Sequence, residues 1–548
     1  MMKRNIIAAL TLAAVLFQSS LFAQAPAIRI TPAERKIAET IRADQLSNWL
    51  HFVASDAMAG RDTPSQGLDV TAEFLKMKLS RWGFRPAGDN GTFFQRMDLT
   101  RESIDAAATF VRLGDKQFKL TEDFFRLGGS GSVENAGLVF GGSGWMVKAK
   151  NYDALDGVDA KGKIVVLFSN GFPSQRTITQ LPQGLSQADL AGTSGVDFAD
   201  PLTNARMKGA VGIILAASPQ VETAWGNIRG FFSRGSLTVE KLRGDGGGQQ
   251  DMLPTILASK KLSDAIFEGE SAGRDSKTAF AINKTISMAA TAKKELLKTQ
   301  NVVAVWEGSD PKLKAEYVAI GSHYDHVGVN ENAPGDDKIY NGADDDGSGT
   351  VGMLAIAEAL ARSKVRPRRS ILFVWHAGEE KGLWGAEYFN KFPTVDIKNV
   401  VAQLNIDMIG RSRKPDDTDQ RNKDLSGPNE VYLIGSEVMS STLGAVTKGV
   451  NSNYLKLDYN YRYDAPNDPN RFFFRSDHFH YALNGIPIAF WFTGVHQDYH
   501  QPGDHADKID YAKMEKIVRT IFMTAWKLAN MNDRPKVDKE LPPELTRR

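Results

Sequence analysis

The chain has 548 residues, roughly three to four times the length of a typical single domain, so we expect more than one domain. Apolar residues make up 42% and charged residues 24%, a composition that excludes a disordered, collagenous or low-complexity protein. Lys and Arg total 67 against 65 Asp and Glu, and this near-neutral balance gives no support for nucleic-acid binding.

The first 23 residues have the order of a cleavable signal peptide. Lys3 and Arg4 precede an apolar run over residues 6–17, which is short for a membrane span, and Ala23 offers a small residue for cleavage. No later stretch of 18 apolar residues occurs, so we expect no membrane span. The absence of cysteine excludes a disulfide framework and a lipid-attachment cysteine. We therefore expect an exported protein that is periplasmic or secreted, of a bacterial type.

The next two segments differ in the secondary structure that their sequence patterns predict. Residues 24–130 contain amphipathic helical patterns and predict an N-terminal helical segment that packs on a catalytic domain. Residues 131–290 contain short β-branched strands separated by glycine turns, at 136–140, 162–168 and 209–216, and predict a β-rich inserted domain.

Residues 291–532 alternate strands with helices and predict a catalytic α/β domain. The expected strands are 301–306, 317–322, 371–376, 399–406, 431–434 and 486–492, and the expected helices are 349–362, 382–391 and 511–530. This alternation is typical of a mixed, mostly parallel sheet flanked by helices. The charged tail over 533–548 is expected to be flexible.

Candidate metal-ligating residues follow the strands of this domain. Eight of the nine histidines lie between residues 323 and 505, which points to one site. The residues in question are His323, the acidic run Asp344–Asp346, the pair Glu379–Glu380, Asp407 and His500. In open α/β sheets ligands bind at the carboxyl ends of the strands, so these side chains should meet at one edge. The acidic run alone could equally be a solvated turn that caps a helix.

The mixture of imidazoles and carboxylates favours zinc, with manganese or cobalt as lesser options. It is large enough for two metals that share a bridging carboxylate. Of the adjacent glutamates, one can bind metal while the other acts as a base. Asp325 is placed to accept the second N–H of His323 and fix its tautomer.

The motifs in this order resemble a known family. They are His-X-Asp at 323–325, Gly-Ala-Asp-Asp-Asp-Gly-Ser-Gly at 342–349, Glu-Glu at 379–380, Asn-Ile-Asp-Met-Ile-Gly at 405–410 and Tyr-His-X-Pro-X-Asp at 499–504. Together they are similar to the bacterial co-catalytic zinc aminopeptidases related to glutamate carboxypeptidase. The middle region is similar, over shorter motifs, to the protease-associated domain inserted in some of these enzymes.

The resemblance implies a zinc exopeptidase fold with two zinc ions per chain and peptide substrates. It makes Asp345 the bridging carboxylate, gives one zinc Glu380 and His500, and gives the other His323 and Asp407. It also implies that Glu379 is the general base and that Tyr499 polarises the scissile carbonyl. Gln501 departs from the threonine that is common in this motif.

Three alternative functions remain open beside an aminopeptidase. They are a carboxypeptidase of the same superfamily, a glutaminyl-cyclase-like aminoacyltransferase, which normally uses one metal, and a receptor-like relative without activity. We read His376 as a core histidine and His326 as a brace for the turn after His323. Arg475, Asp477 and His478 could border a substrate pocket or form a surface ion-pair cluster, and the aromatic runs are read as core.

Overall fold

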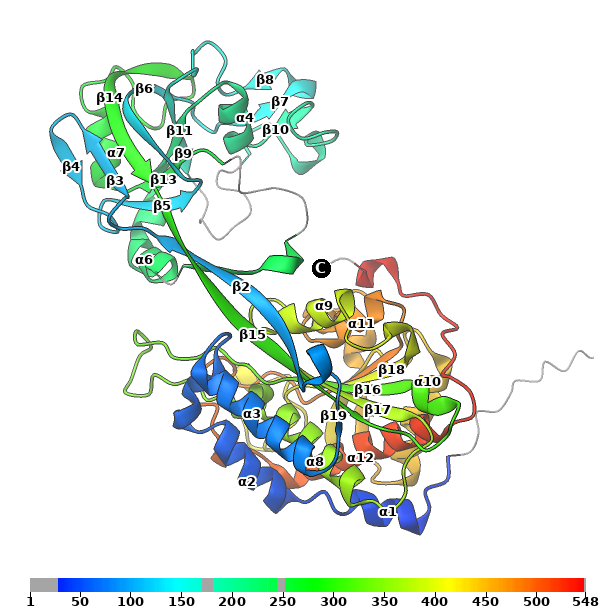
Figure 1. Ribbon diagram of the computed structural model, residues 1–548. Coiled ribbons are helices and arrows are strands. Elements are labelled where there is room, and N and C mark those ends of the chain that lie inside the picture. The colour runs from blue at the N-terminus through cyan, green and yellow to red at the C-terminus, as the bar shows by residue number, and fades with distance from the viewer. Residues whose placement is uncertain (1–27, 170–180, 234, 244–251, 547–548) are drawn as a thin grey trace, which may run out of the picture. The chain divides into compact units, whose positions relative to one another are not determined.

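The computed structural model describes residues 28–169, 181–233, 235–243 and 252–546 (Figure 1). The chain forms two compact units, one made of the residues up to Gln95 together with those from Asn301 onward, and one made of Arg96–Gln300. The predicted signal peptide lies outside the described residues.

The first unit is built on a mixed sheet with a parallel centre. Its strands, in spatial order, are β15 (Ala292–Trp306), β17 (Ser370–His376), β16 (Tyr317–His323), β18 (Val400–Ile406), β21 (Ile488–Phe492), β19 (Glu430–Ile434) and β20 (Asp458–Asn460). β17, β16, β18 and β21 run parallel, whereas β15 and β19 flank them in antiparallel pairing. The short β1 (Arg85–Pro86) pairs with β15. The predicted α/β class with a mixed, mostly parallel sheet is confirmed.

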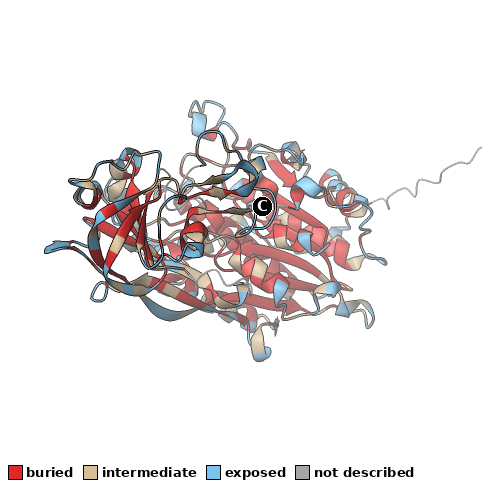
Figure 2. Ribbon diagram, turned by 90° about the horizontal axis from the view of Figure 1, so that it is seen from above, coloured by how far each residue is buried: buried red, intermediate tan, exposed pale blue. Residues whose placement is uncertain are grey.

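Helices cover both faces of this sheet. In Figure 1, α8 (Gly349–Arg362) and α12 (Tyr511–Asn530) lie on one side of the strands, and α9 (Trp384–Lys391) and α11 (His478–Leu483) lie on the other. The remaining helices of the unit are α1 (Pro32–Ala38), α2 (Ala43–Val53), α3 (Gln66–Arg81) and α10 (Ser441–Asn453). α8 is apolar almost all round, and burial of nearly its whole surface follows from that composition. β17 and β18 are buried over their full length. In Figure 2 most of the strands are red, the colour of buried residues.

The second unit holds an eight-stranded sheet. Its strands are β3 (Phe110–Leu113), β4 (Lys116–Phe118), β5 (Phe124–Gly128), β6 (Gly131–Phe140), β9 (Ile164–Ser169), β11 (Gly212–Ala217), β13 (Thr255–Ala258) and β14 (Phe280–Ala290). β6, β9, β11 and β13 form a parallel centre. Alternate residues of β9 face two separate apolar clusters, one holding Ile164 and Val166 and the other Val165 and Leu167.

Shorter elements complete this part of the chain. They are β2 (Phe94–Ile104), which pairs with β12 (Ser236–Val239), the small sheet of β7 (Met146–Val147), β8 (Tyr152–Asp153) and β10 (Phe198–Ala199), and the helices α4 (Pro201–Met207), α5 (Pro219–Thr223), α6 (Trp225–Ser233) and α7 (Lys260–Phe267).

Two features of the predicted organisation need correction. The helical segment expected over 24–130 ends with α3, because β2 to β5 are strands and the second unit already begins at Arg96. The tail expected to be flexible packs onto the first unit. Leu545 is only 2% exposed within an apolar cluster, Asp538 accepts a hydrogen bond from the Ser441 N–H, and Arg534 pairs with Glu316. Apolar contacts, an ion pair and hydrogen bonds attach the tail to this unit, and charge content alone does not reveal them.

Among the described residues, none of the helices is both long enough and apolar enough to cross a lipid bilayer.

Candidate metal centre

The parallel strands place the predicted residues at one edge of the sheet. His323 is the last residue of β16, the Glu379–Glu380 pair follows β17 and Asp407 follows β18. His500 lies in the loop after β21. Because parallel strands end at the same edge, side chains that are far apart in sequence meet there.

These side chains form two groups of potential metal donors. One group consists of His326, Asp345, Glu380 and His500, and the other of His323, Asp346 and Asp407. Within each group the donor atoms lie within 4.8 Å of one another. The structure therefore brings together all five predicted ligands and adds His326 and Asp346.

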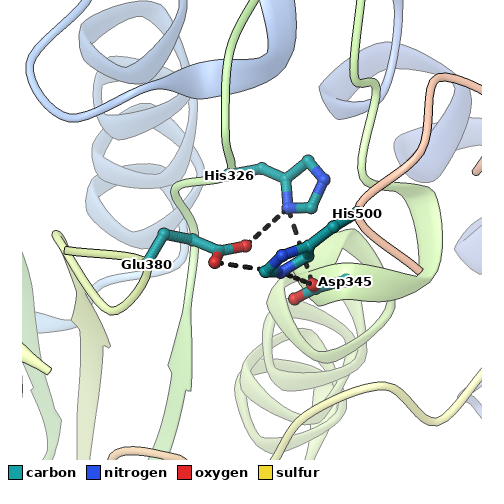
Figure 3. Close-up of side chains that lie close together, drawn as sticks. All are labelled: His326, Asp345, Glu380 and His500. Carbon is teal, nitrogen blue, oxygen red and sulfur yellow. Dashed lines mark hydrogen bonds and ion pairs between the residues drawn. The ribbon is translucent and has the colours of Figure 1, made fainter. Parts of the chain in front are cut away.

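Asp345 lies between the two groups. Its Oδ1 is 3.3 Å from Nε2 of His323, and its Oδ2 is 3.0 Å from Nε2 of His500. The second oxygen of Glu380 is also 3.0 Å from Nε2 of His500 (Figure 3). One carboxylate thus offers an oxygen to each group, which is the geometry of a bridging ligand.

The three consecutive aspartates have different partners. Asp344 Oδ1 accepts from the Gly410 N–H at 2.6 Å, and its Oδ2 lies 3.3 Å from Nε2 of His496. Asp346 Oδ1 accepts from the Gly349 N–H at the start of α8. The acidic run is not a solvated turn, because all three aspartates are buried. Asp346 nevertheless caps a helix, as that reading expected, while Asp345 faces the donor groups.

The two donor groups contain more carboxylates than imidazoles, and the charges of neighbouring members shift the pKa values of several of them. Burial lowers the pKa of His500, but the carboxylates of Asp345 and Glu380 outweigh burial and raise it to about 10. Burial raises the pKa of Asp346 well above its usual range, and the neighbouring charge of Asp407 adds to the effect. Such a set favours bound cations.

The donor set fits divalent metal ions. Asp346 Oδ2 is buried and has no hydrogen-bond partner among the described residues, and such an oxygen calls for a positively charged ligand. The mixture of imidazole nitrogens and carboxylate oxygens suits zinc.

A pocket opens beside the donor groups. It is lined on one side by Asp345, Glu379 and Asp407. The rest of its wall consists of Met408, Phe472, Arg475, Phe490, Phe492, Val495 and Tyr499. Part of the aromatic runs, which the sequence predicts to be core, therefore also forms a pocket wall next to the carboxylates.

Three predicted catalytic residues border this arrangement. The Asp325 carboxylate lies 3.7 Å from Nδ1 of His323, whereas its main-chain carbonyl is closer at 3.2 Å. Asp325 Oδ1 accepts from the Glu379 N–H at 3.2 Å. Burial raises the pKa of Glu379, nearby His323 opposes this, and Glu380 adds to it. Tyr499 stacks on His500 with 4.0 Å between ring centroids, and its hydroxyl accepts from Arg475 at 3.2 Å.

Several residues outside the predicted set matter for this geometry. Arg61 is buried and donates to the carbonyls of Tyr324, Asn341 and Gly342 at 2.9, 2.7 and 2.8 Å, so it joins the two loops that precede the donors. No sequence signal distinguished it from a surface arginine. His326 is only three residues past His323, and this spacing is a signal from which it could have been predicted.

The structure also places the histidine read as core and the three residues for which the sequence left two roles open. His376 is buried, with Asp477 Oδ2 at 3.2 Å and the Tyr481 hydroxyl at 3.1 Å, in agreement with a core histidine. Asp477 and His478 are fully buried, so they do not form a surface cluster, whereas Arg475 is exposed in the pocket wall.

Comparisons with known proteins agree with the motifs. Residues 301–525 match the model of peptidase family M28, which confirms the family resemblance for this segment. A probable leucine aminopeptidase 2 of Aspergillus oryzae is 30% identical over 221 residues, which are 40% of this chain and 38% of that protein. The leupeptin-inactivating enzyme 1 of Streptomyces exfoliatus is 27% identical over 234 residues, 42% of this chain and 44% of that protein. The chain thus spans less than half the length of these two curated relatives.

Among solved structures, an aminopeptidase from Aneurinibacillus sp. strain AM-1 has a TM-score of 0.49 and 18% identity, covering 93% of this chain and 98% of that one. A zinc aminopeptidase from Bacillus subtilis has a TM-score of 0.45 and 15% identity, covering 92% and 99%.

Proposed function

We propose that this protein is a zinc metallopeptidase of the aminopeptidase type that uses two metal ions to hydrolyse the N-terminal peptide bond. The observation that carries the proposal is the position of Asp345, whose two carboxylate oxygens face two separate donor groups. The match of residues 301–525 to peptidase family M28 and the leucine aminopeptidase relatives support it.

His323 and Asp407 would hold one zinc ion, Glu380 and His500 the other, and Asp345 both. When bound, zinc ions acidify water and polarise the peptide carbonyl.

Glu379 is placed to move the proton. It lines the pocket with Asp345 and Asp407, and the Asp325 carboxylate holds its main chain. The carboxylate would take a proton from the attacking water and deliver it to the nitrogen of the leaving amine.

Tyr499 is placed to stabilise the developing oxyanion. Burial raises the pKa of its phenol, so the hydroxyl keeps its proton at neutral pH. Because Arg475 already donates to the hydroxyl oxygen, the Tyr499 proton is available to the substrate carbonyl.

The test combines metal analysis with substrates that differ only at the N-terminus. Purified protein should contain two zinc ions per chain and cleave leucine p-nitroanilide but not its N-acetyl derivative. A preparation that holds one tightly bound metal and cyclises N-terminal glutamine would point to the aminoacyltransferase instead.

One observation favours a carboxypeptidase as second candidate. Such an enzyme needs a cation to hold the substrate carboxylate, and Arg475 is an exposed cation in the pocket wall. Its guanidinium lies 4.8 Å from the centroid of the Phe472 ring and donates a hydrogen bond to Tyr499, so only part of it is free to bind a substrate carboxylate. Cleavage of an N-blocked peptide at its free carboxyl end would support this candidate over the first.

We also propose that the protein is exported after cleavage behind Ala23. The charge and apolar order of residues 1–23 supports this. Mass spectrometry of the mature N-terminus in the periplasm or medium tests it, and Gln24 should be the first residue.

A further inference from the structure

His326 occupies an unexpected place beside the metal donors. It stands outside the motif positions that assign ligands, and the sequence suggested only a brace for the preceding turn. Its imidazole is fully buried, and Nδ1 points into the group of Asp345, Glu380 and His500 (Figure 3).

The distances around Nδ1 suit a shared metal ion. Nδ1 lies 2.8 Å from Glu380 Oε1 and 3.7 Å from Asp345 Oδ2. A tetrahedral zinc ion holds its ligands at about 2.0–2.2 Å, which separates neighbouring donor atoms by roughly 3.3 Å. The His500 contacts to Asp345 and Glu380, both 3.0 Å, fall in the same range. The four donors therefore span one coordination sphere.

The surroundings fix the imidazole in this place. The His326 N–H donates to the Arg61 carbonyl at 3.1 Å, which anchors the main chain. A Cβ at Gly342 would come within 2.5 Å of two ring carbons of His326, so only glycine leaves room for the ring there. The other ring nitrogen, Nε2, has no hydrogen-bond partner within the described chain. Packing and the donor group thus hold the ring.

We propose that His326 binds the metal ion held by Asp345, Glu380 and His500, through Nδ1. This inference rests on the proposed metallopeptidase function and adds a fourth protein donor to one of its two metal positions. With His326 this position has four protein donors, which is the ligand count of structural zinc sites.

The pocket wall includes Asp407 and the base Glu379, whereas His326 does not line it. His326 is therefore placed to hold a metal ion and not to contact the substrate.

A simpler role for His326 is that it donates a hydrogen bond from Nδ1 to Glu380 and orients that ligand. His326→Gln separates the two roles, because a glutamine amide can still donate to a carboxylate but is a poor zinc ligand. His505→Gln is a matched control, since His505 is a half-exposed histidine paired with Asp337 at 3.1 Å outside both donor groups.

The test is proton NMR of the protein loaded with Co²⁺, in which each ligating imidazole gives one strongly shifted, exchangeable N–H signal. The wild type should show three such signals, from His323, His326 and His500. His326→Gln should lose one signal and raise the dissociation constant for Co²⁺ at one position by more than about 100-fold, beyond the usual effect of an outer partner. His505→Gln should change neither quantity.

Two shifted signals in the wild type would overturn the proposal, and this reading does not depend on whether the variant folds. Retention of all wild-type signals and affinity in His326→Gln would overturn it as well. These outcomes differ from failure of the proposed function, in which the wild type would neither bind Co²⁺ at the donor groups nor cleave aminoacyl substrates.

Discussion

Glu379 and Glu380 are neighbours in sequence but face different surroundings. Glu380 lies among the metal donors, 3.0 Å from Nε2 of His500, whereas Glu379 lines the substrate pocket. One side chain is therefore expected to hold metal and the other to move protons.

Substitution of each glutamate by glutamine should separate these roles. Glu380→Gln weakens a ligand, so zinc content and activity should fall together. Glu379→Gln removes only the base, so turnover should fall by about 10²- to 10⁴-fold while both metals stay bound and KM changes little. Steady-state kinetics with metal analysis on the same samples checks this. Normal turnover by fully loaded Glu379→Gln protein would refute the assigned base.

Arg61 illustrates a residue that acts through others. Its buried guanidinium donates to main-chain carbonyls, including those of Val53 and Gly342, and no carboxylate of the described residues lies at hydrogen-bond distance from it. Arg61→Met should leave these acceptors unsatisfied and lower the free energy of unfolding by about 3 kcal/mol.

Urea unfolding of the metal-free protein measures this loss. Arg42→Met is the control, because Arg42 forms an exposed pair with Asp44 and its removal should leave the free energy of unfolding close to the wild-type value. Since Arg61 joins the loops that carry the donors, its variant should also release zinc to a chelator faster. Equal stability of the two variants would show that the loops are held by other contacts.

At the level of elements, the sequence predicted those with strong apolar patterns. The helices expected at 349–362 and 511–530 have the observed bounds of α8 and α12, and the strand expected at 371–376 differs from β17 by one residue. Uninterrupted apolar runs mark buried strands reliably, because both faces of the sheet are covered.

The sequence could not predict contacts that depend on tertiary packing. Arg61 carries no local signal of its role, and His326, although only three residues past His323, lies outside the motif positions that predicted the ligands. Likewise, the burial of Leu545 depends on an apolar cluster formed by distant strands, so the charged tail looked unstructured. Motif order predicted the donor residues that the fold brings together, whereas the residues that support them are apparent only from the fold.

The turn over Arg462–Asp464 contains a carboxylate that should impose a pH dependence on stability. Burial raises the pKa of Asp464 to about 6, while its side chain accepts from the Gly435 N–H after β19. Between about pH 4 and 6 the folded protein holds a proton that the unfolded chain has released, so stability falls as pH rises through this window.

Asp464→Asn should remove this slope and keep the acceptor for Gly435. Relative to wild type it should gain up to about 3 kcal/mol at pH 7 and little at pH 4. Urea unfolding in chelator at both pH values measures the difference. Asp310→Asn should show the opposite sign, since hydrogen bonds from Arg368 lower the pKa of Asp310 to about 2. A gain for Asp464→Asn that is equal at both pH values would contradict the assignment.

For the whole molecule, all donors belong to the unit that excludes residues 96–300. Gln95 and Asn301, which flank residues 96–300, lie close together. The Asn301 side chain donates to the Gln95 side chain at 2.9 Å, and the Val303 N–H donates to the Phe93 carbonyl at 2.7 Å. Replacement of residues 96–300 by a short glycine-rich linker should therefore leave both metals bound. Metal analysis of the monodisperse protein checks this, and loss of zinc would show that the second unit is needed to form the centre.

The central claim is that Asp345 bridges two metal ions. Anomalous diffraction at the zinc edge, from crystals grown with zinc, tests it most directly. We predict two peaks about 3.5–4 Å apart, one on the Oδ1 side of Asp345 next to His323 and the other on the Oδ2 side next to His500. A single peak, or two peaks that do not share Asp345, would contradict the account.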